Sequence, residues 1–398
     1  MDRRDFLCVT GIAGVSTFAG CLERLGFRQQ SAWRDPPLVE NRPDAVYHPA
    51  AAEEMGVYGI VADDEYAVGL SYTFPHRFWT VTGTETNRVV VDADDTMHLM
   101  VSVWDPETEH VLPTDISLEV LADGSAVESI VPWPMLSQRM GFHYGDNVVL
   151  PGEGEYTARI RVGPIQSRRL GHFADRFETA STLEIPFEYS RSDIHDLEFE
   201  VFDTERHGVR EALPAMDHGG NNGDDGYSHD HDHGNGNGNE NGHNHTHDDE
   251  QDRDHDHTNA HDSPAHPPVS YSPDIDTLPG THIGTERAGD ADFPLIETDG
   301  EDQSGDTSLV VLPCTPYNRF ILPFMPLSIT VERDGETLLA DSLEETLTDR
   351  FGHHYRRDIA SLETGDELTI TVDSPPGVSR HDGYETAFFD FADLTYVR

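Results

Sequence analysis

Residues 116–144 read ISLEVLADGSAVESIVPWPMLSQRMGFHY, and residues 327–355 follow the same pattern as LSITVERDGETLLADSLEETLTDRFGHHY. Without any gap, nine of the thirty positions in 115–144 are identical to those in 326–355. In both copies apolar and polar residues alternate up to an Asp-Gly pair, which is typical of a strand that ends in a hairpin turn. The repeat therefore predicts two related β-domains that arose by duplication.

The sequence around the first copy also favours strands. Short runs rich in Val, Ile, Thr and Tyr alternate with turn pairs such as Pro151-Gly152, and no long stretch has a helical apolar period. The runs are Arg88–Asp92, Met97–Trp104, Ile116–Leu121, Tyr156–Val162 and Leu183–Tyr189. We therefore predict an all-β chain with an antiparallel β-sandwich domain at residues 45–205 and a second, smaller sandwich at 306–398.

Between the two predicted domains, residues 206–305 form a polar segment with a histidine-rich centre. Residues 217–266 contain eleven histidines among Asp, Asn and Gly, which predicts a disordered linker. Alternate histidines in an extended chain can share one ion, so the tract is a candidate for weak metal capture; the alternative is a solvated linker in which His is incidental. The His-x-His candidates are His229, His231, His233, His243, His245, His247, His255 and His257.

The charge balance is extreme, with 75 acidic residues against 26 basic ones and a net charge of −49. Acidic residues occur in every segment and no Lys is present, as in proteins from extreme halophiles, where salt screens the repulsion. Such a field disfavours nucleic acid and anionic lipid surfaces as partners.

The N-terminus, MDRRDFLCVTGIAGVSTFAGC, has the order of an export signal. Arg3-Arg4 begins a twin-arginine pattern, a short apolar stretch follows, and Cys21 stands where a lipobox cysteine is acylated. We predict a signal peptide at 1–21, a tether at 22–44 and an extracytoplasmic protein lipid-anchored to the cell membrane. The alternative is a buried N-terminal helix with a chance cysteine. Of three cysteines, Cys314 alone remains in the folded part, so no internal disulfide is expected.

The most specific stretch is WPMLSQRMGFHYGDNVVLPGEGEYTARI at residues 133–160. Its Gly141-Phe142-His143-Tyr144-Gly145 motif, Asn147 and the turn that leads to Tyr156 resemble the periplasmic iron-transport-associated, copper-binding proteins that accompany bacterial iron permeases. The resemblance covers roughly residues 55–190. It implies an immunoglobulin-like sandwich and a homodimer with the metal site near the subunit interface.

The resemblance also implies metal ligands at His98, Met135, His143 and His172. Met100 stands where that family has a Glu ligand, so a soft thioether replaces a hard oxygen there. His76 is a further candidate on an aromatic segment. Imidazoles suit Cu, Zn, Fe and Ni, whereas thioethers favour copper. Each residue also has a structural alternative, because Met is often core packing and a buried His is often simply hydrogen-bonded.

The second domain retains His354 at the position of His143, and His381 at a plausible counterpart of His172. Leu309 and Thr346 replace His98 and Met135, so we expect a structural copy with a weak metal site or none.

Together these patterns predict a metal-binding accessory lipoprotein, not an enzyme, which binds copper or iron and hands it to a membrane permease or reductase. Zinc uptake fits the histidine tract equally well. A metal-dependent oxidase and a cell-surface adhesion module are the alternatives from other classes.

Overall fold

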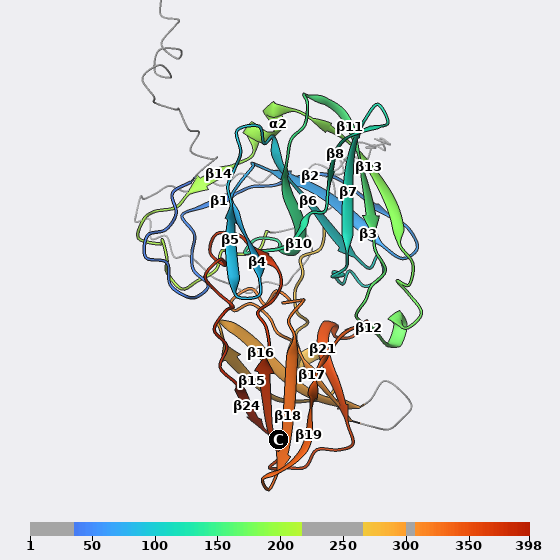
Figure 1. The fold of residues 1–398 in the computed structure, drawn as a ribbon, viewed down its shortest axis with the longest axis vertical. Helices are drawn as coiled ribbons and strands as arrows, with labels where there is room; N and C mark the ends of the chain where they lie inside the picture. The colour runs from blue at the N-terminus through green and yellow to red at the C-terminus, as the bar shows by residue number, and fades with distance from the viewer. Residues whose placement is uncertain (1–35, 217–265, 300–306) are drawn as a thin grey trace, which may run out of the picture.

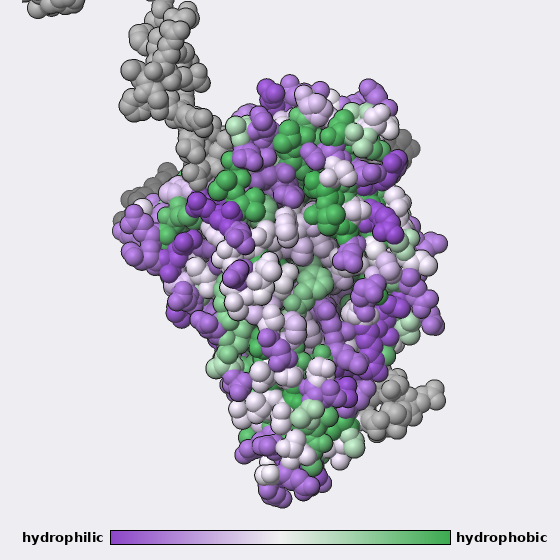
Figure 2. Space-filling view, in the orientation of Figure 1, coloured by the Kyte–Doolittle hydropathy of each residue, from purple (hydrophilic) through white to green (hydrophobic). Residues whose placement is uncertain are grey.

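A computed structural model describes residues 36–216, 266–299 and 307–398, and nearly all of its regular structure is β. Two domains follow one another along the long axis of the molecule (Figure 1). The face shown in Figure 2 is mostly hydrophilic, with apolar residues in scattered patches, as the acidic composition predicts. Within the described residues, no helix has the length and apolar character needed to cross a bilayer.

The first domain consists of two facing sheets. The larger sheet has the order β2-β3-β6-β10-β9-β23-β4-β5. Its strands are β2 (Gly56–Ala62), β3 (Ala67–Thr73), β6 (Met97–Trp104), β10 (Gly141–Val148), β9 (Trp133–Ser137), β23 (Ser379–Arg380), β4 (Phe78–Thr82) and β5 (Glu85–Val89). The smaller sheet consists of β13 (Ser181–Tyr189), β11 (Gly154–Val162), β7 (Ile116–Ala122) and β8 (Ser125–Ile130). The short elements β1 (Ala51–Glu53), β14 (Phe199–Val201), η2 (Gly171–Phe173) and α2 (Arg191–Asp196) lie outside these sheets.

The core of this domain lies between the two sheets. On β7 and β11, alternate residues such as Leu118 and Ile160 point inward and are fully buried, whereas their neighbours are partly or fully exposed. Strand β6 is different, because all eight of its residues are buried. Leu99 and Val101 belong to the core, so His98 and Met100, which alternate with them, lie on the opposite face of the sheet.

The second domain repeats this arrangement. Its larger sheet has the order β12-β20-β21-β17-β16-β15, and its smaller sheet β19-β18-β22-β24. Their strands are β12 (Arg168–Arg169), β20 (Glu344–Thr348), β21 (Gly352–Ile359), β17 (Thr307–Val311), β16 (Ala291–Asp299), β15 (Thr281–Ala288), β19 (Glu336–Ser342), β18 (Leu327–Arg333), β22 (Glu367–Val372) and β24 (Leu394–Val397). The short helix η3 (Ile275–Thr277) precedes β15.

The second domain begins earlier than the expected boundary at residue 306. Strands β15 and β16 lie within the segment expected to be a linker and form a hairpin whose Phe293 and Leu295 are fully buried. The sequence conceals this hairpin because most of β15 is exposed and polar. The segment 206–216 also packs on the first domain, where Leu213 is 7% exposed. The histidine-rich residues 217–265 lie outside the described residues, so their disorder stays a prediction.

Each domain places a short strand in the larger sheet of the other. Strand β23 pairs in parallel with β9 through Ser379 and Met135. In the same way, β12 pairs in parallel with β20 through Arg168 and Thr346. The residue numbers differ by the same amount between Met135 and Thr346 and between Arg168 and Ser379. The same difference separates the first residues of β7 and β18 and those of β10 and β21. The two domains are therefore related as the halves of a duplicated chain, and two continuous sheets join them.

Candidate metal centre

Five side chains from both domains meet on the face of the larger sheet that points away from the core of the first domain. His98, His143 and Met135 lie on the neighbouring strands β6, β10 and β9, and His143 is directly paired with Met135. His76 lies in the turn before β4, and His381 follows β23. We call this set the histidine centre.

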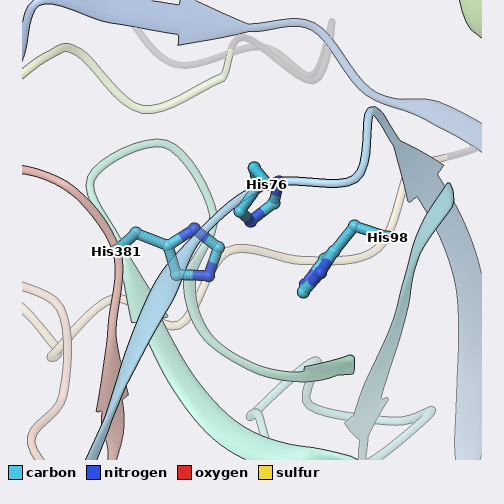
Figure 3. Close-up of side chains that lie close together, drawn as sticks. All are labelled: His76, His98 and His381. Carbon is cyan, nitrogen blue, oxygen red and sulfur yellow. The ribbon is translucent and has the colours of Figure 1, made fainter. Parts of the chain in front are cut away.

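The imidazoles of the histidine centre approach one another closely. Ligand atoms of His76, His98 and His381 all lie within 4.8 Å of one another, and the three rings point toward a common space (Figure 3). The ring centroids of His76 and His98 are 4.1 Å apart, and those of His143 and His381 are 5.4 Å apart. The Nε2 atom of His381 lies 3.4 Å from the Sδ atom of Met135. An ion in this space would have several nitrogen ligands and one sulfur ligand within reach.

Hydrogen bonds fix which nitrogen of each ring faces this space. The Nδ1 atom of His98 lies 2.9 Å from Oδ1 of Asn147, and that of His143 lies 3.1 Å from the carbonyl oxygen of Gly141. The Nδ1 atom of His76 lies 3.0 Å from both the Phe74 carbonyl oxygen and Oε2 of Glu53. With Nδ1 as the donor, each ring presents an Nε2 lone pair, which is the arrangement that metal-binding histidines adopt.

Three of these Nε2 atoms have no hydrogen-bond partner. They belong to His76, His98 and His143, which are 7%, 0% and 1% exposed. Buried polar atoms in proteins are almost always paired, and leaving one unpaired costs about 1–3 kcal/mol. Two of these acceptors, on His76 and His98, face the space that they share with His381, and the His143 ring lies beside it. The donor set of imidazoles and a thioether fits a transition-metal ion.

Gly145 provides the space in which the ligands meet. A Cβ atom added there would lie 2.5 Å from Nε2 of His98 and 3.1 Å from Sδ of Met135. Even Ala would therefore collide with two of the proposed ligands. This explains why the motif that contains His143 continues with Gly.

Burial keeps most of these imidazoles neutral. It lowers the pKa of His143 from 6.5 to about 4, and it places the pKa values of His98 and His381 well below the ordinary range. Desolvation also lowers the pKa of His76, but the Glu53 carboxylate and a backbone carbonyl more than offset this effect, so the pKa is raised overall. A neutral imidazole is the form that binds a metal ion.

The structure brings together His76, His98, Met135 and His143 from the expected ligand set. Met100 is also buried. It lies two residues after His98 on β6 and therefore on the same face of the strand. His172 is elsewhere: it is exposed on η2, and its Nε2 atom lies 3.0 Å from a carboxylate oxygen of Glu107. The linker histidines from His229 to His257 lie outside the described residues, as does Cys21.

Comparison of the two repeats in the sequence matches His381 with His172, and this equivalence is wrong. The amide of His381 donates to the Leu136 carbonyl, and the amide of Leu170 donates to the Leu347 carbonyl at the equivalent place. The structural counterpart of His381 is therefore Leu170, not His172. No local pattern marks His381 as a ligand, because its position depends on β23 joining the sheet of the other domain.

The equivalent place in the second domain has lost its ligands. His354 is retained and fully buried, but Thr346 and Leu170 occupy the positions equivalent to Met135 and His381. Strand pairing places Ser308, not the expected Leu309, at the position of His98: Ser308 lies opposite Asp358 as His98 lies opposite Asn147, and Leu309 belongs to the core. Arg356 replaces Gly145, is 1% exposed, and has its Nε atom 3.2 Å from Oδ1 of Asp358. A built-in guanidinium therefore stands where the first domain leaves room for an ion.

Comparison with known families finds one match in each domain. Residues 106–195 match the family described as Fe2+ transport protein, and residues 276–397 match a domain of unknown function, DUF7350. Neither description names an enzyme. The second match begins before β15 and so includes the hairpin that the linker prediction missed. A search of curated proteins returns no match to the chain.

Two similar solved structures are of FetP from uropathogenic Escherichia coli. A copper-bound variant of FetP is 18% identical, covering 34% of this chain and 93% of that chain with a TM-score of 0.28. FetP as isolated after expression in the periplasm is also 18% identical, covering 34% of this chain and 96% of that chain with a TM-score of 0.26. The family match itself rests on residues 106–195, which include His143 and Met135, so over this segment the first domain is similar to the Fe2+ transport protein family.

Proposed function

We propose that this chain is an extracytoplasmic transition-metal-binding lipoprotein that assists iron or copper uptake and holds the ion at the histidine centre. The observation that carries the proposal is the set of unpaired, buried Nε2 atoms on His76, His98 and His143. An ion among His76, His98 and His381, whose ligand atoms all lie within 4.8 Å of one another, would satisfy the first two of these atoms, and the His143 ring lies beside them at 5.4 Å from that of His381.

The ligands favour copper among the transition metals. Imidazole binds several borderline ions, but the Met135 thioether is soft and favours copper. Met100 stands at the position where the resembling family has a Glu ligand, so a hard oxygen ligand is absent there. The family match over residues 106–195 points to iron as the transported metal. The two are compatible if the bound copper serves iron handling, and stable binding without turnover is the behaviour that we propose. Zinc remains the alternative ion.

The second domain completes the centre. Its His381 reaches Met135 through a strand that belongs to the sheet of the first domain. The family resemblance implies a site near a subunit interface, and we propose that the second domain takes the place of a partner subunit within one chain. A homodimer of the whole chain stays a prediction.

Capture and anchoring involve residues outside the described ranges. We propose that the tract at 217–265 gathers ions weakly and that Cys21 carries the lipid anchor, which keeps the protein at the outer face of the cell membrane. A membrane permease or reductase is the proposed recipient. Met216, the last described residue before the tract, lines a pocket that also contains His76 and His381.

The test is the metal content and affinity of the chain from Leu22 onward, prepared in high salt, with and without residues 217–265. His143→Ala removes one buried imidazole from the histidine centre. His354→Ala is the matched control, since it removes the equivalent buried imidazole from the second domain. We expect one tightly held equivalent that survives deletion of the tract, disappears with His143→Ala and is retained in His354→Ala.

Other outcomes would select the alternatives. If all binding leaves with the tract and His143→Ala changes nothing, the chain is a surface β-module that carries a metal-gathering segment. If zinc is the ion retained after purification in mixed metals, the role is zinc uptake. Sustained oxygen consumption with ferrous ion would favour the oxidase.

A further inference from the structure

Methionines are concentrated in one place in this chain. Of eight methionines, Met55, Met100, Met140 and Met216 line a single pocket of about 110 Å³. We call it the methionine pocket. A fifth, Met135, belongs to the histidine centre. The remaining three are Met1, Met97 and Met325.

The four pocket methionines come from separate parts of the first domain. Met55 lies between β1 and β2, Met100 lies on β6, and Met140 lies in the turn between β9 and β10. Met216 ends the segment that follows the domain, and its amide donates to the Arg139 carbonyl at 3.0 Å. Four chain segments thus each contribute one thioether to the same space.

Ordinary core packing does not account for this composition. The main core consists mostly of Val, Leu, Ile and aromatic side chains. Met55, Met100 and Met140 form a separate buried cluster, with Val57 and Met216 packed against it. Among the described residues, four of the five side chains in this cluster are therefore methionines. Leu could fill an apolar space of this size as well as Met does. What distinguishes this cluster from the main core is therefore the sulfur atom of each methionine.

The methionine pocket adjoins the histidine centre. His76 and His381 line both, and Met100 lies on the same face of β6 as His98. Four charged residues line the pocket. Glu53 contacts the His76 ring, and Arg77 pairs with Asp382 at 2.6 Å between Nη2 and Oδ2. Arg139 donates from Nη1 to the Glu53 carbonyl oxygen at 3.5 Å. The volume far exceeds the roughly 10–15 Å³ that a single water molecule requires, so an ion fits without displacing a side chain.

We infer that the methionine pocket binds a soft monovalent cation, Cu(I), through its thioethers, as a site separate from the histidine centre. Thioether sulfur is a soft, uncharged ligand that selects Cu(I) over hard divalent ions. The pocket would thus receive reduced copper beside the imidazoles, whereas the histidine centre takes the borderline divalent ion. The inference goes beyond the proposed function and does not require the histidine centre to be occupied.

The experiment uses the full chain with carbon-13 methyl-labelled methionine and Ag(I) as a redox-inert probe for Cu(I). Nitrate salts at high ionic strength replace chloride, which precipitates silver. We expect the methyl signals of Met55, Met100, Met140 and Met216 to shift with the first equivalents of Ag(I), while those of Met97 and Met325 stay in place. Ag(I) bound by histidines of the tract does not perturb methionine methyl groups, so the tract does not confuse the result.

The matched variants are Met55→Leu/Met140→Leu and the control Met97→Leu/Met325→Leu. Exchanges of Met for Leu conserve volume and usually cost less than about 1.5 kcal/mol, so both variants should fold. The pocket variant should lose at least ~10-fold in Ag(I) affinity, whereas the control should keep it. Pocket signals that do not move at several equivalents of Ag(I), or equal affinities in the two variants, would show that the pocket is apolar packing alone.

The two proposals fail separately. His143→Ala should abolish tight divalent binding and leave the Ag(I)-induced methionine shifts unchanged. If the histidine centre binds nothing, those shifts still appear. If the methionine pocket binds nothing, the divalent equivalent is still held in Met55→Leu/Met140→Leu.

Discussion

His381, near the end of the chain, places its Nε2 atom 3.4 Å from the Sδ atom of Met135 in the other domain. Because β23 joins the sheet beside β9, this contact depends on the two domains sharing a sheet. The centre is therefore a property of the whole chain, and isolating the first domain would remove one of its imidazoles.

Replacing His381 should weaken metal binding although it lies in the second domain. His381→Ala removes a ring whose ligand atom lies within 4.8 Å of those of His76 and His98. We expect affinity to fall by more than the ~10–100-fold typical of an outer hydrogen-bond partner, as measured by competition with a chelator. His172→Ala is the control and should leave affinity unchanged, because His172 is exposed and contacts Glu107. If His172→Ala lowered the affinity and His381→Ala did not, the fourth imidazole ligand would be His172.

Gly145→Ala should abolish tight binding while the fold survives. The new Cβ would lie 2.5 Å from Nε2 of His98, so the ring must turn away from the other ligands. Metal content after dialysis and the circular dichroism of the sheet measure the two effects. Gly152→Ala adds a methyl group with no atom within 4 Å of its Cβ and serves as the control. Wild-type metal content in Gly145→Ala would place the ion elsewhere.

Asn147 should act as a positioning residue for two ligands. Its Oδ1 lies 2.9 Å from Nδ1 of His98, and its Nδ2 donates to the His76 carbonyl at 2.9 Å. Asn147→Ala should lower metal affinity about 10–100-fold by freeing the His98 ring and the backbone that carries His76. The exposed Asn87→Ala on β5 should have no effect. A shift in the spectroscopic signature of bound Cu(II), which a merely destabilised fold would not produce, tests the positioning role.

The metal-free protein should lose stability in mild acid. Burial holds the pKa of His143 at about 4 in the folded state against 6.5 when exposed, so the unfolded chain binds more protons between these values. The free energy of unfolding therefore falls as pH drops from 6.5 toward 4, by up to ~3 kcal/mol for this group. Urea unfolding with a chelator present should show a steeper decline for wild type than for His143→Gln. Equal slopes would mean that His143 is accessible to protons in the folded state.

Salt should stabilise the fold through screening. With a net charge of −49, lowering the salt from about 1 M to 0.1 M lengthens the Debye length from ~3 to ~10 Å and strengthens self-repulsion. The melting temperature should fall over this range, and by the same amount in nitrate and in chloride at equal ionic strength. A melting temperature that does not depend on salt would remove the comparison with halophile proteins.

Local patterns were sufficient for the sandwich and for four of the five side chains of the histidine centre. The apolar run of β6 indicates a strand, and the motif around His143 marks a candidate ligand, which strand pairing places opposite Met135. His381 could not be found in this way, since a two-residue strand carries no periodic signal and its destination is decided by packing. The hairpin β15–β16 was missed for a related reason: its exposed strand resembles a polar linker.

Arg356 shows that the two halves of a fused chain can acquire different residues at equivalent positions. In a symmetric pair of identical chains, one codon specifies both copies of every position, so a change that fills one metal site fills the other. Here the positions of Gly145 and Arg356 are inherited separately, so each can be selected for a different task. Joining the halves has thus broken the symmetry: one half keeps the open space of the histidine centre, and the other is free to become scaffold that supplies His381 across the boundary.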